Sequence, residues 1–575
     1  MRVKRARRIV VEAHPSSHTC SRRARPHVAA WAARAASPCS ASRRAPRATA
    51  GPGDARRRAG VESDRMTAIH RSTIGDLVRR SARRVPDAHA LAFEDRTWSY
   101  RQLDDASTRV AARLLAAGLR RGDRVAAFGK NSDAYVILWL GVVKAGLVHV
   151  PVNFALTGRE LAYILRQSGA RAVFADAALR AGVEQCGVVP EILGSLRDGA
   201  GERDVLAWAR VEAPVPPLDV AIEDTDLAQI LYTSGTTSDP KGAMLTHRAL
   251  LHHYASAALA LDARASERQL HALPLYHSAQ MHVFMMPSLM LGAPNWLLES
   301  PDPARVVAAI SEHAIDAFFA APTVWIALLA LVEKAPERVS MLRKAYYGAS
   351  IMPTPVLQRL RRLLPALGFY NCFGQSEIGP LATVLRPEEH EARPASAGRA
   401  IPFVDLRVVD DDMVDVEPGE IGEVVYRSPQ LCLGYWDKPA ETEEAFAGGW
   451  FHSGDLARID EEGYITIVDR KKDVIKTGGV VVSSREVEEA LFSHPAVREV
   501  AVVPIPDPTW IEAVTAVVVL HDGAAADEAS LVEHARGRLA GFKVPKRVHF
   551  VDALPKNTAG KLLKRELRER LAPAR

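Results

Sequence analysis

The sequence predicts an α/β protein with a large N-terminal domain of parallel-type sheets and flanking helices, a small β module, and a small α+β domain at the C-terminus. From about residue 73, strand-like apolar runs alternate with amphipathic helical patterns, which is typical of parallel sheets covered by helices. From about residue 400 to 470, short strands alternate with Gly-rich turns, which predicts an antiparallel module. Residues near 473 to 575 then follow the order helix, strand, strand, helix, strand.

The spacing of apolar residues predicts the first elements along the chain. Residues 90–100 read as a hairpin, and apolar residues three and four apart predict an amphipathic helix over 101–119. The same reasoning predicts strands at 124–130, 148–152 and 228–232, and a helix at 132–146.

The second half of the large domain repeats this order. Residues 317–335 predict a strand followed by a helix, with Thr323 as a candidate cap. Thr354 is the expected N-cap of the next helix, with Pro355 as its first helical residue. In the C-terminal unit we expect a helix over 483–497 and strands over 498–505 and 513–520.

A chain of 575 residues is too long for one domain. We expect a basic extension over residues 1–65, a large domain over 66–471 and a small domain over 472–575. Residues 1–65 hold 16 Lys and Arg against 4 Asp and Glu, whereas the rest of the chain holds 58 against 64. The rest of the chain is therefore mildly acidic, and nothing in it predicts nucleic-acid binding.

The basic extension has too little apolar content to form a core. Three interpretations compete: a transit peptide, a basic arm, or upstream sequence read from an over-early start, with Met66 as the true start. We favour the third, because the excess of Arg over Lys throughout the chain suggests GC-rich coding DNA.

Cysteine usage and hydropathy exclude several other classes. The five cysteines are scattered without a CxxC pattern, so neither a disulfide framework nor a structural zinc site is expected. The apolar stretches 281–298 and 317–332 contain prolines or polar residues and do not predict membrane spans. We expect a cytoplasmic protein, with peripheral membrane contact left open.

The most informative local stretch is "LYTSGTTSDPKGAMLTH", residues 231–247, which places six hydroxyl side chains and two glycines around Lys241 directly after an apolar strand. Glycines allow close backbone approach, and hydroxyls and a lysine can hold a polyphosphate. The pattern lacks the GK[ST] ending of a Walker A loop. Taken alone, the stretch is equally compatible with an ordinary surface loop.

Further motifs follow this stretch in a fixed order. They are "YYGAS" (346–350), "FYNCFGQSEIGP" (369–380), "GWFHSGDLARIDEEGYITIVDRKKDVIKTGG" (449–479), "SSREVEEAL" (483–491) and "LPKNTAGKLLKREL" (554–567). The set resembles the adenylate-forming superfamily of acyl-CoA synthetases, nonribosomal adenylation domains and firefly-type luciferases. The resemblance extends from about residue 70 to the end of the chain and implies a mobile C-terminal domain.

The resemblance assigns the nucleotide contacts. The opening loop is expected to hold the β- and γ-phosphates of ATP, although Ser238 stands where the family usually has Gly. Residues 348–350 are expected to pass along the adenine, and Ser376 to touch the α-phosphate. The expected nucleotide-binding residues are Thr233, Ser234, Gly235, Thr236, Thr237, Lys241, Gly348, Ala349, Ser350, Gly374, Gln375, Ser376, Asp455, Arg470, Gly478 and Gly479.

Within that set, Asp455 and Arg470 resemble the pair that binds the ribose, since a carboxylate accepts two hydroxyl donors. Glu377 resembles the family's Mg²⁺ ligand, with Thr233 beside it, and Mg²⁺ needs few carboxylates when phosphates supply the other oxygens. Lys472 occupies the family's hinge position.

The resemblance also assigns the catalytic groups. Lys561 resembles the lysine that bridges the acyl carboxylate and the α-phosphate, where a cation stabilises developing charge. Lys476, with Gly478 and Gly479, is expected to line the pantetheine tunnel. His277 is expected at the mouth of the acyl pocket; a half-buried structural histidine is an equal alternative.

The implied reaction has two steps: a carboxylate and Mg-ATP give acyl-AMP and pyrophosphate, and coenzyme A then accepts the acyl group. The stretch "YHSAQMHVFMMPSLML" contains no acidic residue for an amino acid and no Arg for a dicarboxylate, which favours a lipophilic acid, and a medium- or long-chain fatty acid first. An aryl acid, or transfer to a carrier-protein thiol, is the alternative. The expected pocket wall is Met281, Phe284, Met285, Phe318, Trp325, Ile351 and Ile378.

Overall fold

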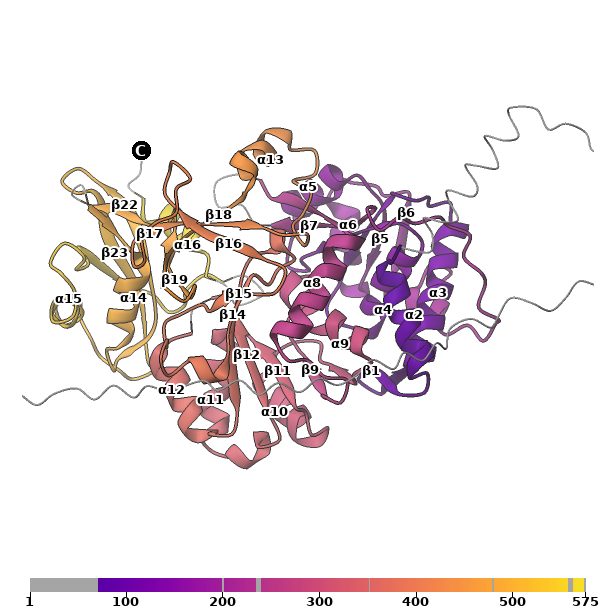
Figure 1. The fold of residues 1–575 in the computed structure, drawn as a ribbon, viewed down its shortest axis with the longest axis horizontal. Helices are drawn as coiled ribbons and strands as arrows, with labels where there is room; N and C mark the ends of the chain where they lie inside the picture. The colour runs from indigo at the N-terminus through magenta and orange to yellow at the C-terminus, as the bar shows by residue number, and fades with distance from the viewer. Residues whose placement is uncertain are drawn as a thin grey trace, which may run out of the picture. The chain divides into compact units, whose positions relative to one another are not determined.

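The computed structural model describes residues 71–198, 201–233, 239–350, 352–477, 480–556 and 562–572 (Figure 1). Residues 70–575 form one compact unit. The expected extension over 1–65 lies outside the described residues. None of the helices in the described part of the chain combines the length and apolar character needed to cross a membrane.

The first sheet has six strands in the order β6-β5-β3-β4-β7-β8, all parallel except β8. Its strands are β3 (Arg124–Phe128), β4 (Val148–Val152), β5 (Ala170–Ala175), β6 (Ile192–Ser195), β7 (Leu227–Thr233) and β8 (Lys241–Thr246). The parallel order confirms the arrangement predicted from the β–α alternation.

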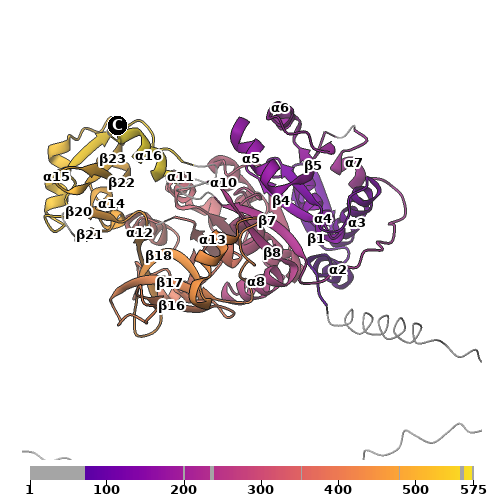
Figure 2. The same cartoon turned by 90° about the horizontal axis from the view of Figure 1, so that it is seen from above.

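Helices cover both faces of this sheet. Successive strand residues point to opposite faces, and both faces carry apolar side chains that the helices bury. Val125 and Ala127 pack in one cluster, whereas Ala126 and Phe128 pack in another. The first cluster contains α2 (Ile74–Arg84), α3 (Tyr100–Ala116), α4 (Asp133–Lys144) and α7 (Val205–Ala209). The second contains α5 (Gly158–Ser168) and α6 (Ala177–Gln185), and Figure 2 shows the two groups on opposite sides of β4 and β5.

The second sheet has nine strands in the order β15-β14-β13-β12-β11-β9-β10-β1-β2. They are β1 (His89–Phe93), β2 (Arg96–Ser99), β9 (Gln269–His271), β10 (Asn295–Leu297), β11 (Ala317–Ala320), β12 (Lys344–Gly348), β13 (Gly368–Phe373), β14 (Thr383–Leu385) and β15 (Arg399–Ala400). β1 and β2 form the predicted antiparallel hairpin, and the central strands from β13 to β1 are parallel.

The two faces of the second sheet bury different cores. Phe319 packs with α8 (His247–Ala260) and the π-helix η1 (Ala279–Met285), whereas Phe318 packs with the helices of the other face. Those helices are α10 (Pro303–Glu312), α11 (Pro322–Val332) and α12 (Thr354–Leu363). α8 also contributes Leu250 and Tyr254 to the first sheet's core, as do residues of α9 (Met286–Leu291). α8, η1 and α9 therefore lie between the two sheets.

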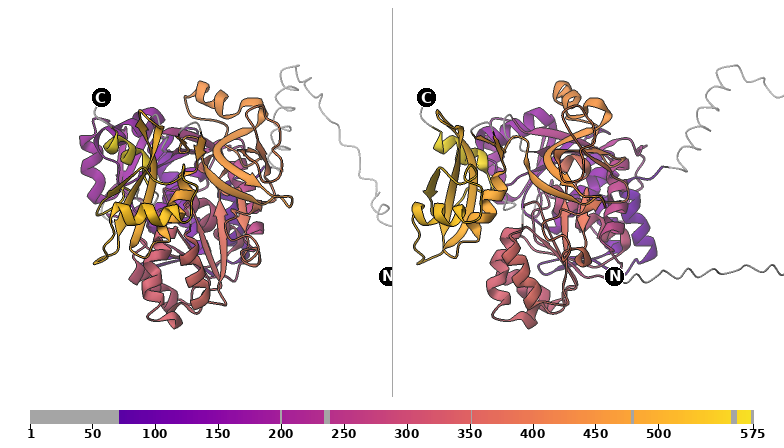
Figure 3. Two further views of the ribbon diagram at one scale, coloured as in Figure 1. Left: turned by 90° about the vertical axis from the view of Figure 1, so that its left-hand side faces the viewer. Right: turned by 60° about the vertical axis from the view of Figure 1, so that its left-hand side comes forward.

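The remaining strands form the predicted β module and C-terminal domain. The module is an antiparallel sheet of β16 (Asp405–Val409), β17 (Ile421–Arg427), β18 (Phe451–Ile459) and β19 (Ile465–Arg470). The helix α13 (Pro439–Ala445) lies between β17 and β18 in the chain. The C-terminal sheet contains β20 (Ile475–Thr477), β21 (Val480–Val482), β22 (Val497–Asp507), β23 (Ile511–Leu520) and β24 (Arg547–Phe550). Its helices are α14 (Ser484–Phe492), α15 (Glu528–Arg536) and α16 (Lys564–Leu571), which Figure 3 shows against the strands.

Two predicted helix starts are wrong by one or two residues. α11 has Ala321 as its N-cap and Pro322 as its first residue, so Thr323 lies inside the helix. The residue before a proline is disfavoured in the helical region, so Ala321 stays extended and the helix begins at Pro322. α12 has Pro353 as its N-cap, so Thr354 is its first residue and Pro355 its second.

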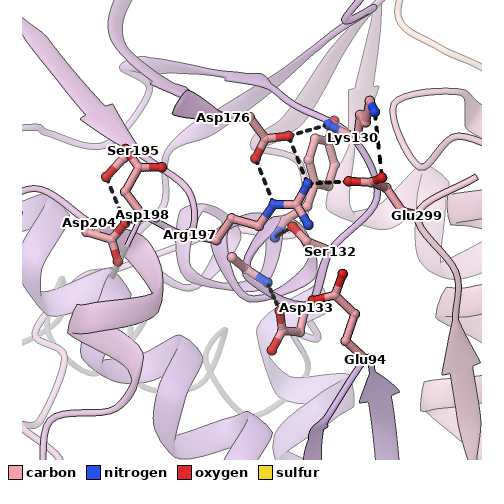
Figure 4. A network of polar contacts seen from close by, with 12 residues as sticks. Glu94, Lys130, Ser132, Asp133, Asp176, Ser195, Arg197, Asp198, Asp204 and Glu299 are labelled. Carbon is pink, nitrogen blue, oxygen red and sulfur yellow. Dashed lines mark hydrogen bonds and ion pairs between the residues drawn. The ribbon is translucent and has the colours of Figure 1, made fainter. Parts of the chain in front are cut away.

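An ion-pair network joins the two sheets at the carboxyl ends of their strands (Figure 4). The Arg197 guanidinium, just after β6, lies 3.1 Å from Asp176 and 2.7 Å from Glu299. The Lys130 backbone N–H donates to Asp176 at 2.9 Å, and its ammonium lies 3.6 Å from Glu299. Glu299 follows β10 of the second sheet, so these pairs fix one sheet against the other.

Beside this network, Asp133 at the start of α4 binds Arg96 and Trp98 of β2. Its carboxylate accepts two hydrogen bonds from Arg96, at 2.8 and 2.9 Å, and one from the Trp98 indole at 2.9 Å. The guanidinium groups of Arg96 and Arg197 lie over the Phe93 ring, at 5.2 and 5.6 Å from its centroid. Cation–π contacts of this kind add to the ion pairs.

We expect Glu299→Gln to change how stability depends on pH. The hydrogen bond from Arg197, opposed by burial and reinforced by Lys130, lowers the pKa of Glu299 below its ordinary value of 4.5. The charged carboxylate therefore stabilises the folded state above pH 4.5, and this contribution is lost as the pH falls through the lowered pKa. Denaturant unfolding should show a wild-type advantage at neutral pH that shrinks in acid.

The control for this experiment is Glu461→Gln, an exposed glutamate in the turn between β18 and β19. Its unfolding free energy should follow the wild type at every pH. A constant difference between wild type and Glu299→Gln from neutral to acidic pH would contradict the assignment.

Candidate active site

The strand pair β7–β8 closes the hydroxyl-rich loop. Thr233 at the end of β7 pairs with Lys241 at the start of β8, so residues 234–238 connect two hydrogen-bonded strand ends. The predicted phosphate contacts Ser234, Gly235, Thr236 and Thr237 lie outside the described residues. The Lys241 ammonium lies 5.1 Å from the centre of the Tyr435 ring.

Glu377 is a nearly buried carboxylate beside Thr233. It belongs to the short 3₁₀ turn Ser376–Ile378 and is 7% exposed. Its Oε1 accepts hydrogen bonds from the Thr233 hydroxyl at 3.3 Å and from the Tyr435 phenol at 3.1 Å. Burial and the Glu377 charge raise the pKa of Tyr435, so the phenol stays protonated and donates.

This donor set fits one Mg²⁺ ion shared with phosphates. Among the described residues there is no group of three or more His, Cys, Asp or Glu that could hold a metal alone. One fixed carboxylate beside a hydroxyl suits Mg²⁺, which normally keeps waters and takes oxygens from the substrate phosphates.

The segment after β13 begins at Gly374, where no side chain larger than that of glycine fits. A Cβ on Gly374, whose φ is +153°, would lie 2.1 Å from the Pro380 carbonyl oxygen. The next residue, Gln375, has a buried Oε1 without a hydrogen-bond partner. The Ser376 hydroxyl lies 2.9 Å from the Ser278 hydroxyl, which ties this segment to the start of η1. An orphaned amide oxygen beside a glycine is compatible with a bound nucleotide.

Gly348 ends β12 beside the same segment. A Cβ there would lie 2.2 Å from the Cys372 carbonyl oxygen on the neighbouring strand. Ala349 has a φ of +64°, and both Ala349 and Ser350 are exposed. The turn therefore presents open backbone next to Gly374, as an adenine contact would require.

Asp455 and Arg470 are cross-strand partners in β18 and β19. The Arg470 Nε lies 3.0 Å from Asp455 Oδ1, and Asp455 is 3% exposed. The Asp455 charge, more than any other group, raises the pKa of Arg470. The structure thus brings together the two residues predicted to bind the ribose.

Of the residues predicted for the thiol-transfer step, the structure describes Lys476. Lys476 is exposed on β20, and its backbone N–H donates to Glu512 at 2.6 Å. Gly478, Gly479 and Lys561 lie outside the described residues. His277 is half-buried immediately before Ser278, and its backbone N–H donates to the Pro274 carbonyl at 3.1 Å.

The predicted acyl-pocket wall is divided among three cores. Phe284 and Ile378 lie in the cluster that also contains Cys372, beside Gly348. Met281 and Met285 pack instead toward the first sheet, and Phe318 and Trp325 lie beneath the opposite face of the second sheet. Ile351 lies outside the described residues. Strand alternation separates Phe318 from its neighbour Phe319, which shares a face with Tyr346.

Comparison with known proteins decides the family. The chain matches the family described as AMP-binding enzyme over residues 78–436, and the AMP-binding enzyme C-terminal domain over 486–561. The chain belongs to the AMP-binding enzyme family. The resemblance predicted from the motifs and the predicted fold class are both confirmed.

Three relatives show what this ligase is similar to. A feruloyl-CoA synthase from Amycolatopsis sp is 37% identical over 499 residues, covering 86% of this chain and 99% of the relative. Long-chain-fatty-acid–CoA ligase FadD13 of Mycobacterium tuberculosis is 35% identical over 507 residues, covering 86% and 98%. The crystal structure of ATP-bound MatB from Rhodopseudomonas palustris has a TM-score of 0.80 and 32% identity, covering 87% and 99%.

The chain is therefore an ATP-dependent, acyl-adenylate-forming acid–CoA ligase. Sequence reasoning missed two residues at the site of this ligase. Tyr435 lies 58 positions from Glu377 and reaches it through the loop after β17. Ser278 reaches Ser376 across 98 positions. No local pattern marks either residue, because a lone Tyr or Ser carries no signal of its distant partner.

We expect Tyr435→Phe to raise the Mg²⁺ concentration needed for half-maximal ATP–pyrophosphate exchange by about tenfold or less, the size of one lost hydrogen bond. Among the described residues, the substitution leaves Thr233 as the hydroxyl donor to the Glu377 carboxylate. Exchange would be measured across a Mg²⁺ titration, with thermal unfolding to verify folding.

Tyr464→Phe is the matched control, because the Tyr464 phenol donates to Glu389 instead, at 2.7 Å. It should leave the Mg²⁺ titration unchanged. Equal shifts in the two variants would show that Tyr435 has no particular role at Glu377.

Proposed function

We propose that this ligase activates a compact lipophilic acid, aryl or short-chain, as acyl-AMP and transfers the acyl group to coenzyme A. The observation that carries the choice of acid is a row of aromatic side chains across the sheet face beneath Gly348. Tyr346 is the register partner of both Phe319 and Tyr370 on the adjacent strands.

The row is closed on the helix side by Phe284 of η1. Its ring stacks on Phe319 at 4.3 Å between centroids and lies 5.0 Å from the Tyr346 ring. Tyr346 and Tyr370 rings lie 5.3 Å apart. The row crosses the sheet two residues before Gly348, which is about 7 Å along a strand. An acid that enters at Gly348 and ends at this row would have room for roughly five carbon–carbon bonds, at about 1.5 Å each.

The relatives support both compact and extended acids. The feruloyl-CoA synthase is named for an aryl acid, in accord with a shallow aromatic pocket. The fatty-acid ligase is named for long chains, which agrees with the medium- or long-chain acid favoured from the sequence. The depth above the aromatic row favours the first class, and the long-chain acid is the second candidate.

In the proposed reaction, Thr233, Lys241 and the loop between them hold the β- and γ-phosphates. Glu377 would hold Mg²⁺, which would supply positive charge against the phosphates. Asp455 accepts hydrogen bonds from the ribose, with Arg470 keeping its carboxylate in place. Ser376 faces the α-phosphate, and the open backbone of 348–350 passes along the adenine.

The acid and the α-phosphate are both anions, so their approach requires a cation between them. We assign that role to Lys561 and the later thiol step to Lys476, with a C-terminal domain over 472–575 that turns about Lys472 between the steps. His277 lies beside the site and would border the acid entrance.

The acid would be identified by acid-dependent ATP–pyrophosphate exchange over a panel from butanoic to hexadecanoic acid, with benzoic and 3-phenylpropenoic acids. We expect the aryl and short acids to exceed hexadecanoic acid by about tenfold or more in kcat/KM. Thioester should form only when coenzyme A is added. Exchange that is fastest with hexadecanoic acid would instead support the long-chain candidate.

We expect Lys561→Ala to lower acid-dependent exchange by about a hundredfold or more, because it removes the charge between the two anions. The same variant should still convert supplied acyl-AMP and coenzyme A to thioester. Lys543→Ala, whose ammonium pairs with Glu486 at 2.6 Å, is the control and should keep both activities. Equal loss of both half-reactions in folded Lys561→Ala would refute the assignment.

A further inference from the structure

A small cavity lies beyond the aromatic row, between α8, η1 and the second sheet. Its volume is about 10 Å³, roughly the room that one water molecule requires. Its lining includes Ala257, Val283, Phe284, Pro287, Ser288 and Tyr346. Phe284 and Tyr346 therefore belong both to the aromatic row and to the cavity wall.

The cavity continues the line of the proposed acid pocket. η1 starts beside Ser376, through the Ser278 contact, and leads through Phe284 into α9 and Ser288. Gln269, which also lines the cavity, pairs with Ala317, and Ala317 pairs with Lys344. That register places the cavity floor four strand residues before Gly348, about 13 Å along the strand.

Ser288 is the polar residue of the cavity wall whose side chain lacks a partner, and Gln269 and Tyr346 are the other polar residues among the lining. It is fully buried, and its Oγ has no hydrogen-bond partner. A buried hydroxyl without a partner costs free energy, and a helical serine usually bonds back to a carbonyl of its own helix. Apolar neighbours such as Ala257, Val283 and Pro287 offer it no partner, so a ligand atom in the cavity would satisfy it.

We propose that this cavity receives the distal end of the acid, and that Ser288 binds a hydroxyl group carried there. This inference rests on the proposed function and names its substrate class: an aryl acid with a spacer between ring and carboxylate and a hydroxyl at the far end of the ring. The Phe284 ring is the partition between the two spaces, and its rotation away from Phe319 opens the path. Phe284 and Ser288 thus determine specificity for the length and the polar end of the acid.

The direct test compares 3-(4-hydroxyphenyl)propenoic acid with 3-phenylpropenoic acid in ATP–pyrophosphate exchange. Ser288→Ala should lower kcat/KM for the hydroxylated acid by about tenfold, the size of one hydrogen bond, and leave the unsubstituted acid unchanged. The loss should appear in KM, and calorimetric titration of the acid should show the same weakening.

Ser168→Ala is the matched control. Ser168 is equally buried in a helix, but its hydroxyl donates to the Leu165 carbonyl at 3.3 Å and it lies in α5 of the first sheet. This variant should treat the two acids as the wild type does.

The partition is tested with Phe284→Ala over the series of straight-chain acids. Removal of the ring should join the two spaces and move the preferred chain length upward by several carbons. Phe318→Ala, on the opposite face of the same sheet, should lower stability comparably without moving the preference. Phe284→Leu gives a milder change of the same kind should Phe284→Ala unfold.

The outcomes separate this inference from the function on which it rests. Absence of exchange with every acid would remove the proposed function itself. Exchange with aryl acids, but equal effects of Ser288→Ala on both propenoic acids, would overturn the inference alone and leave the cavity as a packing defect. An unchanged chain-length preference in folded Phe284→Ala and Phe284→Leu would overturn it as well.

Discussion

Three distant parts of the chain meet at one carboxylate oxygen. Glu377 Oε1 accepts from Thr233 at the end of β7 and from Tyr435 after β17, while Glu377 itself follows β13. The first sheet, the second sheet and the β module each contribute one of these residues. Two hydroxyl donors hold the carboxylate in position, which is what a shared metal ion and a triphosphate require.

The sequence was sufficient for the fold class, for the hairpin of β1 and β2, and for the ordered motifs that place Asp455 opposite Arg470. Apolar periodicity and motif order are local signals, so these features could be read directly. The wall of the proposed acid pocket could not be predicted in this way, because it depends on which face of each strand a residue occupies. Phe318 and Phe319 are equally apolar, and the alternation that separates them is decided by the partner strands.

The helices between the sheets also escaped prediction in detail. η1 is a π-helix, so its residues do not follow the usual spacing of three and four. Met281 and Met285 consequently face the first sheet, while Val283 and Phe284 face the second. η1 and its N-cap bring Ser278 to Ser376 and Phe284 to Phe319, so one element contacts both the proposed nucleotide site and the proposed acid site.

The contact between Gly348 and the Cys372 carbonyl has a consequence for how such ligases diversify. No side chain fits at position 348 unless a neighbouring strand moves. The strand edge at position 348 is thus closed to larger residues. A change in the acid accepted would have to come from exchangeable side chains elsewhere: those two residues away along the strands, such as Tyr346, and those of η1, such as Phe284. The backbone beside the proposed nucleotide site would stay the same while the floor of the acid site varies.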